Sequence, residues 1–542
     1  MRHAFLPLLL VLPLAAQAPP TFRSETRLVE LQVVVTGRDR APVTGLSAED
    51  FTILENGKRK SIAFFTAPAA QPKRRPEPLP PGLLTNRPEY APGAPQGIMA
   101  VVLDVLNTDM RDRYFARSQV ARFLKGLTGS ERVGIYVLAD RLRLIHSFTE
   151  DPLSLARMVQ TLRNEWPAAS LASEARIRGE ADLLWQAMGG QEFDSLLTGI
   201  DTQEEMAKEL RIRMTLEQLE ILGHHLAGVP GRKSLVWVSS GIPMLTVAFS
   251  PNLNNPRGSA LAYYYRENAR FERAVRRLAE ANVAVYPVDA RGLQVDNLTP
   301  VVQPNLGPYG GRGDTAFNRE LRRVPAADTF PAMQFLADAT GGRALYNTND
   351  LESGLRQAAD DLQSNYTLAY YTDLDDDAKK RELNVRVRGR GLDVLARKRV
   401  PAARRDGLLE VRDLLDSPID ATGVLLNGRV TRDANQLHVT LQIEPGSLLL
   451  SRNGVHTEAI VEIYLAQITP AGQRKVQDAR LSLRLTEPEL AKLINDGLLY
   501  QRTLDLDPET ERLRILVRDA RSGASGTIDA PIRLVPNEPP PR

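Results

Sequence analysis

Residues 98–108 read IMAVVLDVLNT and give the strongest indication of the fold class. It begins with a continuous apolar run, which is typical of a strand buried on both faces of a parallel sheet, because such a strand has no solvent-facing side. The run ends at Asp104, and Asn107 and Thr108 follow closely. Polar side chains directly after a buried parallel strand lie at the carboxyl edge of the sheet, where open α/β sheets bind ligands.

Three further apolar runs repeat this pattern, over residues 133–138, 234–240 and 283–288. Amphipathic segments with helical spacing of their apolar residues separate the runs, notably 203–227 and 262–281. Strands separated by helices of this length predict right-handed crossovers and a parallel sheet that is covered on both faces. The sequence therefore predicts a central α/β domain of the doubly wound, Rossmann-like class.

Segments rich in β structure flank this domain. Residues 27–36 alternate and are rich in β-branched side chains, and an Asn56-Gly57 turn joins two further short strands. These features predict a small N-terminal β module. Toward the C-terminus, short alternating runs recur, among them 436–443 and 458–465, and they predict an antiparallel β-sandwich.

The length of 542 residues requires several hydrophobic cores. Changes in pattern and in proline content suggest where one unit ends and the next begins. The expected divisions are a signal peptide (1–18), the N-terminal β module (22–66), a Pro-rich linker (67–97), the α/β domain (98–372) with insertions near 165–200 and 291–328, a β extension (373–403), the β-sandwich (406–535) and a disordered tail (536–542).

The N-terminus has the three parts of a secretory signal. Arg2 and His3 precede an apolar run over residues 5–15, and Ala16–Ala18 has the small-residue pattern that signal peptidase cleaves. The run is shorter than the roughly 20 residues that span a bilayer, and no later segment is apolar for that length. We therefore expect an exported protein, periplasmic or secreted, with no transmembrane segment.

Composition and motifs argue against several classes of function. The chain has no cysteine, which excludes disulfides, thiol catalysis and cysteine-bound zinc. The net charge is only +3 and the basic residues are spread along the chain, so no nucleic-acid partner is expected. Ser239 and Ser240 lie in the sequence VSSG, which lacks the first glycine of the G-x-S-x-G motif. Nothing in the insertions near 165–200 and 291–328 combines a nucleophile with a base, so a hydrolase that uses one of them is the least favoured interpretation.

Five stretches together carry a family resemblance. They are LVELQVVVTGRDRAPVTGLSAEDFTILENGKRKSIAFF (28–65), VVLDVLNT (101–108), LAGVPGRKSLVWVSSGIP (226–243), FLADATGGRALYNTNDL (335–351) and YTLAYYT (366–372). Their order and spacing resemble the von Willebrand factor A-related family that is widespread in Acidobacteria. The resemblance implies a von Willebrand factor A-type fold for the central domain and a binding role rather than a catalytic one.

Domains of this type commonly carry a metal-ion-dependent adhesion site on the carboxyl edge of the sheet. The first loop of that site reads Asp-x-Ser-x-Ser, a later loop reads Thr-Asp-Gly or similar, and their oxygens bind a divalent cation. Asp104 and Thr108 match the first and third positions of the first loop. Leu106 replaces the middle serine and cannot ligate, and Ser240 stands where the second carboxylate is expected. The resemblance thus implies a degenerate site.

Two interpretations of this site stay open. In one, Mg²⁺ or another divalent cation binds the two matching residues and Ser240, helped by an earlier threonine for which Thr202 and Thr215 are candidates. In the other, no ion binds, and Asp104 and Asn107 cap the helix that follows. No other cofactor is expected.

The predicted function is binding of a protein or glycan partner at the carboxyl edge. The expected contact surface is a rim that consists of Asp104, Asn107, Thr108, Ser239 and Ser240. A structural role in a cell-envelope assembly is the alternative.

Overall fold

The structure is a computed structural model that describes residues 26–68, 82–90, 97–108, 110–127, 132–162, 211–241, 258–293, 329–373, 381–400, 411–453 and 455–537. The predicted signal peptide, the 165–200 insertion and Thr202 lie outside the described residues, as do residues 294–328 of the second insertion. Within the described part of the chain, no helix combines the length and the apolar character needed to cross a bilayer.

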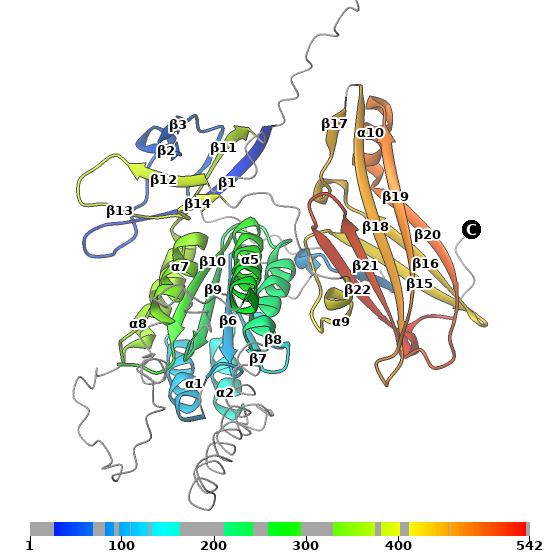
Figure 1. Cartoon of the computed structure of the whole chain (residues 1–542), viewed down its shortest axis with the longest axis horizontal. Helices are drawn as coiled ribbons and strands as arrows, with labels where there is room; N and C mark the ends of the chain where they lie inside the picture. The colour runs from blue at the N-terminus through cyan, green and yellow to red at the C-terminus, as the bar shows by residue number, and fades with distance from the viewer. Residues whose placement is uncertain are drawn as a thin grey trace, which may run out of the picture.

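The centre of the molecule is a five-stranded sheet with the strand order β10-β9-β6-β7-β8 (Figure 1). Its strands are β6 (Ile98–Asp104), β7 (Val133–Leu138), β8 (Leu142–Thr149), β9 (Lys233–Ser239) and β10 (Val283–Asp289). Strand β8 is antiparallel to β7, and the other pairs are parallel. A parallel bridge between Val288 and Leu345 extends the sheet beyond β10. Every residue of β6, β7, β9 and β10 is buried, which explains their apolar runs.

Helices cover both faces of this sheet. The even-numbered apolar residues of β6 share a cluster with the helix over residues 211–226, α5 (Gly258–Glu280) and α7 (Thr329–Thr340). The odd-numbered ones share a second cluster with α1 (Met110–Lys125), α2 (Pro152–Thr161) and α8 (Leu351–Gln363). A fully buried aliphatic side chain contributes roughly 1.5–3 kcal/mol. This two-sided burial therefore provides much of the stability of the central unit.

The N-terminal β module and the predicted β extension form one unit. Strand β1 (Thr26–Thr36) pairs with β11 (Asn365–Asp373) and β13 (Asp393–Leu395), while β11 also pairs with β4 (Phe64–Thr66). In the second sheet the pairs join β2 (Phe51–Glu55), β3 (Lys58–Lys60), β12 (Arg381–Val387) and β14 (Arg399–Val400). The division predicted at residue 372 was therefore wrong, because β11 pairs with strands of the β module and not with the central sheet.

This β module lies at the amino edge of the central sheet (Figure 1). Just before β10, Asn282 Nδ2 donates to Glu30 at 3.0 Å, and Arg397 Nη1 donates to the Ala279 carbonyl at 3.0 Å. Gly341 has φ +81°, and a Cβ built on it would be 2.8 Å from the Arg397 backbone. Only glycine therefore fits at this contact. Because β10 starts here, its carboxyl end lies at the opposite edge of the sheet.

The C-terminal unit is an antiparallel sandwich. One sheet contains β15 (Leu426–Asp433), β16 (Gln436–Ile443) and β20 (Leu498–Asp505). The other contains β17 (Ser451–Asn453), β18 (His456–Ile468), β19 (Arg474–Leu485), β21 (Arg512–Asp519) and β22 (Ser525–Pro531). Helix α9 (Val411–Asp416) precedes the sandwich, and α10 (Glu487–Asp496) connects β19 to β20.

Two predictions for the ends of this unit were wrong. Leu83–Thr85, within the predicted linker, form β5, which pairs with β15 and so adds an edge strand to the sandwich. The predicted tail also begins as ordered chain, because Arg432 and Asn537 form a parallel bridge. In both cases the backbone finds hydrogen-bond partners on a strand that is distant in the sequence.

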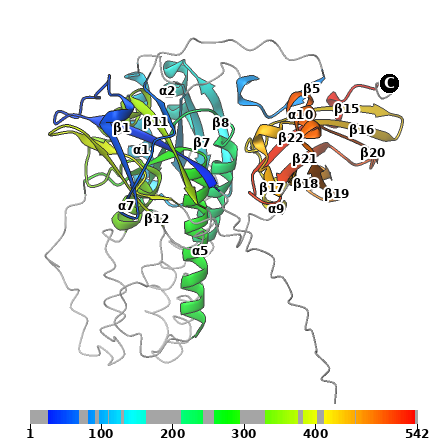
Figure 2. The ribbon, with the colours of Figure 1, turned by 90° about the horizontal axis from the view of Figure 1, so that it is seen from above.

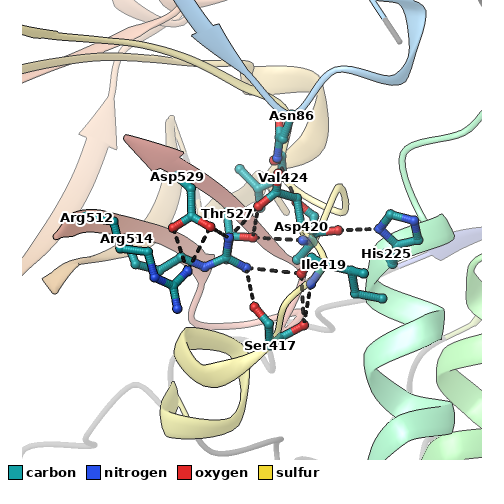
Figure 3. Close-up of polar contacts among 11 residues, drawn as sticks. Asn86, His225, Ser417, Ile419, Asp420, Val424, Arg512, Arg514, Thr527 and Asp529 are labelled. Carbon is teal, nitrogen blue, oxygen red and sulfur yellow. Dashed lines mark hydrogen bonds and ion pairs between the residues drawn. The ribbon is translucent and has the colours of Figure 1, made fainter. Parts of the chain in front are cut away.

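The sandwich lies to one side of the central domain (Figure 2). A polar joint connects it to the helix over residues 211–226 (Figure 3). His225 Nδ1 donates to the Asp420 carbonyl at 2.6 Å, and its Nε2 lies 2.9 Å from the Tyr136 hydroxyl. Burial lowers the pKa of His225, which favours the neutral ring. Arg514, only 1% exposed, donates to Asp420 Oδ1 at 2.6 Å. Buried hydrogen bonds of this kind hold the two units in one orientation.

Lys233, the first residue of β9, generates a prediction about pH. It is 2% exposed, and its ammonium donates to the Val229 carbonyl at 2.7 Å. Burial lowers its pKa from 10.5 to about 7. Between pH 7 and about pH 10 the unfolded chain binds this proton more tightly than the folded chain, so the free energy of unfolding should rise with pH.

Lys233→Met should therefore stabilise the chain by roughly 2 kcal/mol at pH 7, and by progressively less toward about pH 10. Urea unfolding followed by circular dichroism measures this difference. Lys492→Met, at an exposed lysine on α10, is the matched control and should change stability by less than about 0.5 kcal/mol. If Lys233→Met keeps the pH dependence of the parent, the ammonium is not the titrating group.

Candidate functional site

Three strands of the central sheet end side by side at its carboxyl edge. Strand β6 ends at Asp104, β9 at Ser239 and β10 at Asp289. The loops that follow β6 and β9 touch, since the Ser240 backbone N–H donates to Thr108 Oγ1 at 3.1 Å. The structure thus brings the predicted rim residues together around the ends of two neighbouring strands.

Burial divides the predicted rim into two groups. Asp104, Thr108 and Ser239 are 2%, 3% and 0% exposed. Asn107 and Ser240 are partly exposed. The expectation that all five side chains form a contact surface was therefore wrong, because the first three lie beneath the surface and can only support it.

Asp104 is the buried anionic centre of the loop after β6. Its Oδ1 accepts from the Asn107 backbone N–H at 2.9 Å. Its Oδ2 accepts from Asn107 Nδ2 at 2.9 Å and from Trp237 Nε1 at 3.2 Å. Burial raises the pKa of Asp104 from 3.8 to about 6, although hydrogen bonds from Asn107 and Trp237 act in the opposite direction. Both carboxylate oxygens are therefore engaged by N–H donors of the protein.

Thr215 is the candidate threonine that the structure brings to this loop. Its Oγ1 accepts from Asn107 Nδ2 at 2.8 Å and donates to the Arg211 carbonyl at 2.8 Å. Thr215 lies on the helix over residues 211–226, which also carries His225 at the joint with the sandwich. Asn107 therefore connects the loop after β6 to this helix.

Asp112 belongs to the site but was not predicted from the sequence. It lies in the first turn of α1, where the helix dipole favours a carboxylate. The Ser240 hydroxyl donates to Asp112 Oδ2 at 2.7 Å. A second carboxylate does approach the loop after β9, but it comes from α1 and not from that loop. The signal in the sequence was an acidic residue in a first helical turn, which is too common to be specific.

The hydroxyl groups of the two serines at the end of β9 do not make the contacts of a catalytic serine. Ser239 Oγ donates to the Gly241 carbonyl at 3.0 Å, and Ser240 Oγ donates to Asp112. A serine is activated when its hydroxyl donates to a general base such as histidine. Neither hydroxyl donates to a histidine here, so these contacts do not provide the hydrolase interpretation with a nucleophile.

Leu106, at the middle position of the adhesion motif, faces the core. It is 8% exposed and shares an apolar cluster with Ile212 and Leu216 of the helix over residues 211–226. A side chain at this position would have to leave that apolar cluster in order to coordinate a metal ion. Across the residues that the structure describes, no group of three or more histidine, aspartate or glutamate side chains could hold a metal ion.

An aromatic group with an arginine lies at the end of β10. Asp289 is fully buried and pairs with Arg291 through contacts of 2.8 and 2.9 Å. The Arg291 guanidinium lies 5.6 Å from the centre of the Phe330 ring, which stacks on Tyr346 at 4.6 Å. On the neighbouring α1, Tyr114 is 68% exposed. These residues were not predicted, because single aromatic residues show no periodic pattern.

A small pocket of about 50 Å³ opens behind the loop after β6. Its lining consists of Leu103, Asp104, Val105, Thr108, Arg113, Ala116, Arg117, Val137, Leu162 and Val238. Arg113 donates to the carbonyls of Thr108 and Val105, both at 2.7 Å. Its guanidinium therefore fixes the loop from below.

Comparisons with known proteins identify no family. No family model matches the chain, and no curated protein matches it. Among solved structures, an aerotolerance-related membrane protein from Bacteroides fragilis aligns with 48% of this chain and 97% of its own, at 13% identity and a TM-score of 0.20. BatB from Bacteroides thetaiotaomicron, a conserved hypothetical protein, aligns with 49% and 97%, at 13% identity and a TM-score of 0.22.

A third solved structure covers more of the chain. The N-terminal domains of the type V pili tip protein Mfa5 from Porphyromonas gingivalis align with 91% of this chain and 77% of that one, at 10% identity and a TM-score of 0.20. At TM-scores this low, none of the three likenesses carries an argument about fold or function.

Trp237→Phe tests the hydrogen bond that links β9 to Asp104. A hydrogen bond to an ionised acceptor contributes about 1.5–3 kcal/mol and one to a neutral acceptor about 1 kcal/mol. Because the pKa of Asp104 is about 6, the variant should lose more stability at pH 7.5 than at pH 5. We expect the variant to lose about 1 kcal/mol more of its free energy of unfolding at pH 7.5 than at pH 5, measured by urea unfolding.

Ser234→Ala is the matched control on the same strand. It removes a buried hydrogen bond of 3.1 Å to the Ala358 carbonyl, which does not titrate. Its loss of stability should be equal at the two pH values. An equal loss for Trp237→Phe as well would show that no titrating carboxylate faces the indole.

Proposed function

We propose that the chain is an exported, non-enzymatic binding protein that docks a protein or glycan partner on the carboxyl edge of a von Willebrand factor A-type domain. The observation that carries this proposal is the location of the two β units. The β module contacts the amino edge at Asn282 and Ala279. The sandwich contacts the helix end at His225. The described contacts of both units therefore leave the carboxyl edge free.

The chemistry of that edge supports partner binding. Tyr114, Leu293 and Tyr346 are 68%, 52% and 38% exposed. Aromatic residues and arginine are enriched in protein interfaces, where a few of them provide most of the binding energy. The hydrogen bonds around Asp104 hold the adjoining loop in place, so little conformational entropy would be lost on docking.

The topology supports the domain type. The order β10-β9-β6-β7-β8, with one antiparallel edge strand and helices on both faces, suits a doubly wound domain that binds at its carboxyl edge. Asp104 and Thr108 also keep two positions of the family's first loop. Where the family carries a cation, Asn107 Nδ2 of this chain contacts Asp104 and Thr215.

A structural role in a cell-envelope assembly is the second candidate function. It is favoured by the joint at His225, Asp420 and Arg514, whose buried hydrogen bonds would keep the sandwich at a fixed angle under load. Native mass spectrometry of isolated envelopes separates the candidates. A stoichiometric complex that survives dilution favours the structural role, and an exchangeable partner favours recognition.

The docking surface is tested with the double variant Tyr114→Ala/Tyr346→Ala in the full chain. Crosslinking and pull-down from the native envelope should enrich a partner when the parent chain is the bait. With the double variant as bait, the amount of this partner should fall about 10-fold, because a few anchor residues provide most of the binding energy of an interface. Tyr371→Ala removes a tyrosine that is 60% exposed on β11 and should leave the enrichment unchanged. A partner that binds the double variant and the parent equally would place the docking surface elsewhere.

A further inference from the structure

The side-chain amide of Asn107 lies between two buried oxygen atoms. Its Nδ2 is 2.9 Å from Asp104 Oδ2 and 2.8 Å from Thr215 Oγ1. Asp104 and Thr215 are 2% and 1% exposed and come from different elements of the fold. A carboxylate and a hydroxyl brought together in this way are the oxygen ligands that a hard divalent cation would join.

The two neighbours show which end of the amide lies between them. The Thr215 hydroxyl donates its hydrogen to the Arg211 carbonyl at 2.8 Å, so toward Asn107 it accepts. An ionised Asp104 carboxylate can also only accept. The atom between these two acceptors must therefore carry two hydrogens. The NH2 group does, whereas the amide oxygen of a flipped side chain would face two oxygens without a proton.

The remaining oxygens of the predicted cation site are also directed at protein groups. Asp104 Oδ1 accepts from the Asn107 backbone N–H, and Thr108 Oγ1 accepts from the Ser240 backbone N–H. Ser240 Oγ donates to Asp112 Oδ2. Mg²⁺ requires near-octahedral oxygen ligation at about 2.0–2.1 Å. The oxygens present accept N–H hydrogen bonds or, at Ser240, donate an O–H hydrogen bond within the protein, so the donor set does not fit the cation.

We infer that the Asn107 amide takes the place of the divalent cation in this domain, so that the carboxyl edge keeps its shape without a metal ion. The two N–H groups of the amide bridge the loop after β6 to the helix over residues 211–226, as a cation would. Three N–H donors from Asn107 and Trp237 offset the charge of Asp104. This inference concerns the loop and not the partner, so it stands or fails separately from the proposed docking.

The first test is a titration of the full chain with Mn²⁺, followed by electron paramagnetic resonance of the free ion. We expect no saturable binding up to about 1 mM, the weak end of protein cation sites. Saturable binding that disappears in Asp104→Ala would overturn the inference, because it would place the ion where the amide lies.

The second test is Asn107→Asp, which replaces the NH2 group by a second carboxylate oxygen facing Asp104. The melting temperature at pH 8 should fall because of like-charge repulsion, and millimolar Mn²⁺ should recover most of the loss. Asn86→Asp is the matched control, since Asn86 Nδ2 donates to the Ala421 and Val424 carbonyls, both at 2.8 Å. It should lose stability without recovery by Mn²⁺.

An equal response of the two variants to Mn²⁺ contradicts the inference, because the position of Asn107 would then have no special affinity for a cation. If Asn107→Asp does not fold, the Mn²⁺ titration of the parent chain decides alone. A parent chain that fails to bind Mn²⁺ but still captures its partner separates this inference from the docking proposal.

Discussion

The central sheet is buried on both faces, and this burial dictates where polar groups can lie in the central domain. Because every residue of β6, β9 and β10 is buried, charged side chains can appear only where these strands end. Asp104 and Asp289 lie at such ends, and each carboxylate accepts hydrogen bonds from neighbouring N–H groups. A buried carboxylate needs this compensation, since its desolvation would otherwise outweigh its contacts. The polar network at the carboxyl edge is therefore a consequence of strand burial.

The two β units are built from segments that are far apart in the sequence. In the sequence, β1 precedes the central domain and β11 follows it, yet the two strands pair. Strand β5 precedes the central domain as well, and it pairs with a sandwich whose other strands come after residue 425. Antiparallel ladders of this kind satisfy the backbone of segments that would otherwise be edges. Their location matters for function, because the β module covers the amino edge of the central sheet and its described contacts do not reach the other edge.

The helix over residues 211–226 connects the candidate site to the sandwich. Thr215 near its start receives the Asn107 amide, and His225 near its end donates to Asp420. At about 1.5 Å per residue these two contacts are about 15 Å apart along the axis. The loop after β6 and the sandwich therefore contact the same helix, so a displacement of this loop would act on the helix that positions the sandwich.

Apolar runs and helical periodicity predicted the strands and helices of the central domain that the structure describes, because both patterns are local signals of burial. It also predicted that the ends of β6 and β9 would meet, since carboxyl ends of neighbouring parallel strands share one edge. The folded chain shows in addition that β11 pairs with β1, that Ser239 is buried, that Thr215 is the threonine next to Asn107 and that Asp112 accepts from Ser240. These outcomes depend on contacts between distant segments, and no local pattern specifies which segments will meet.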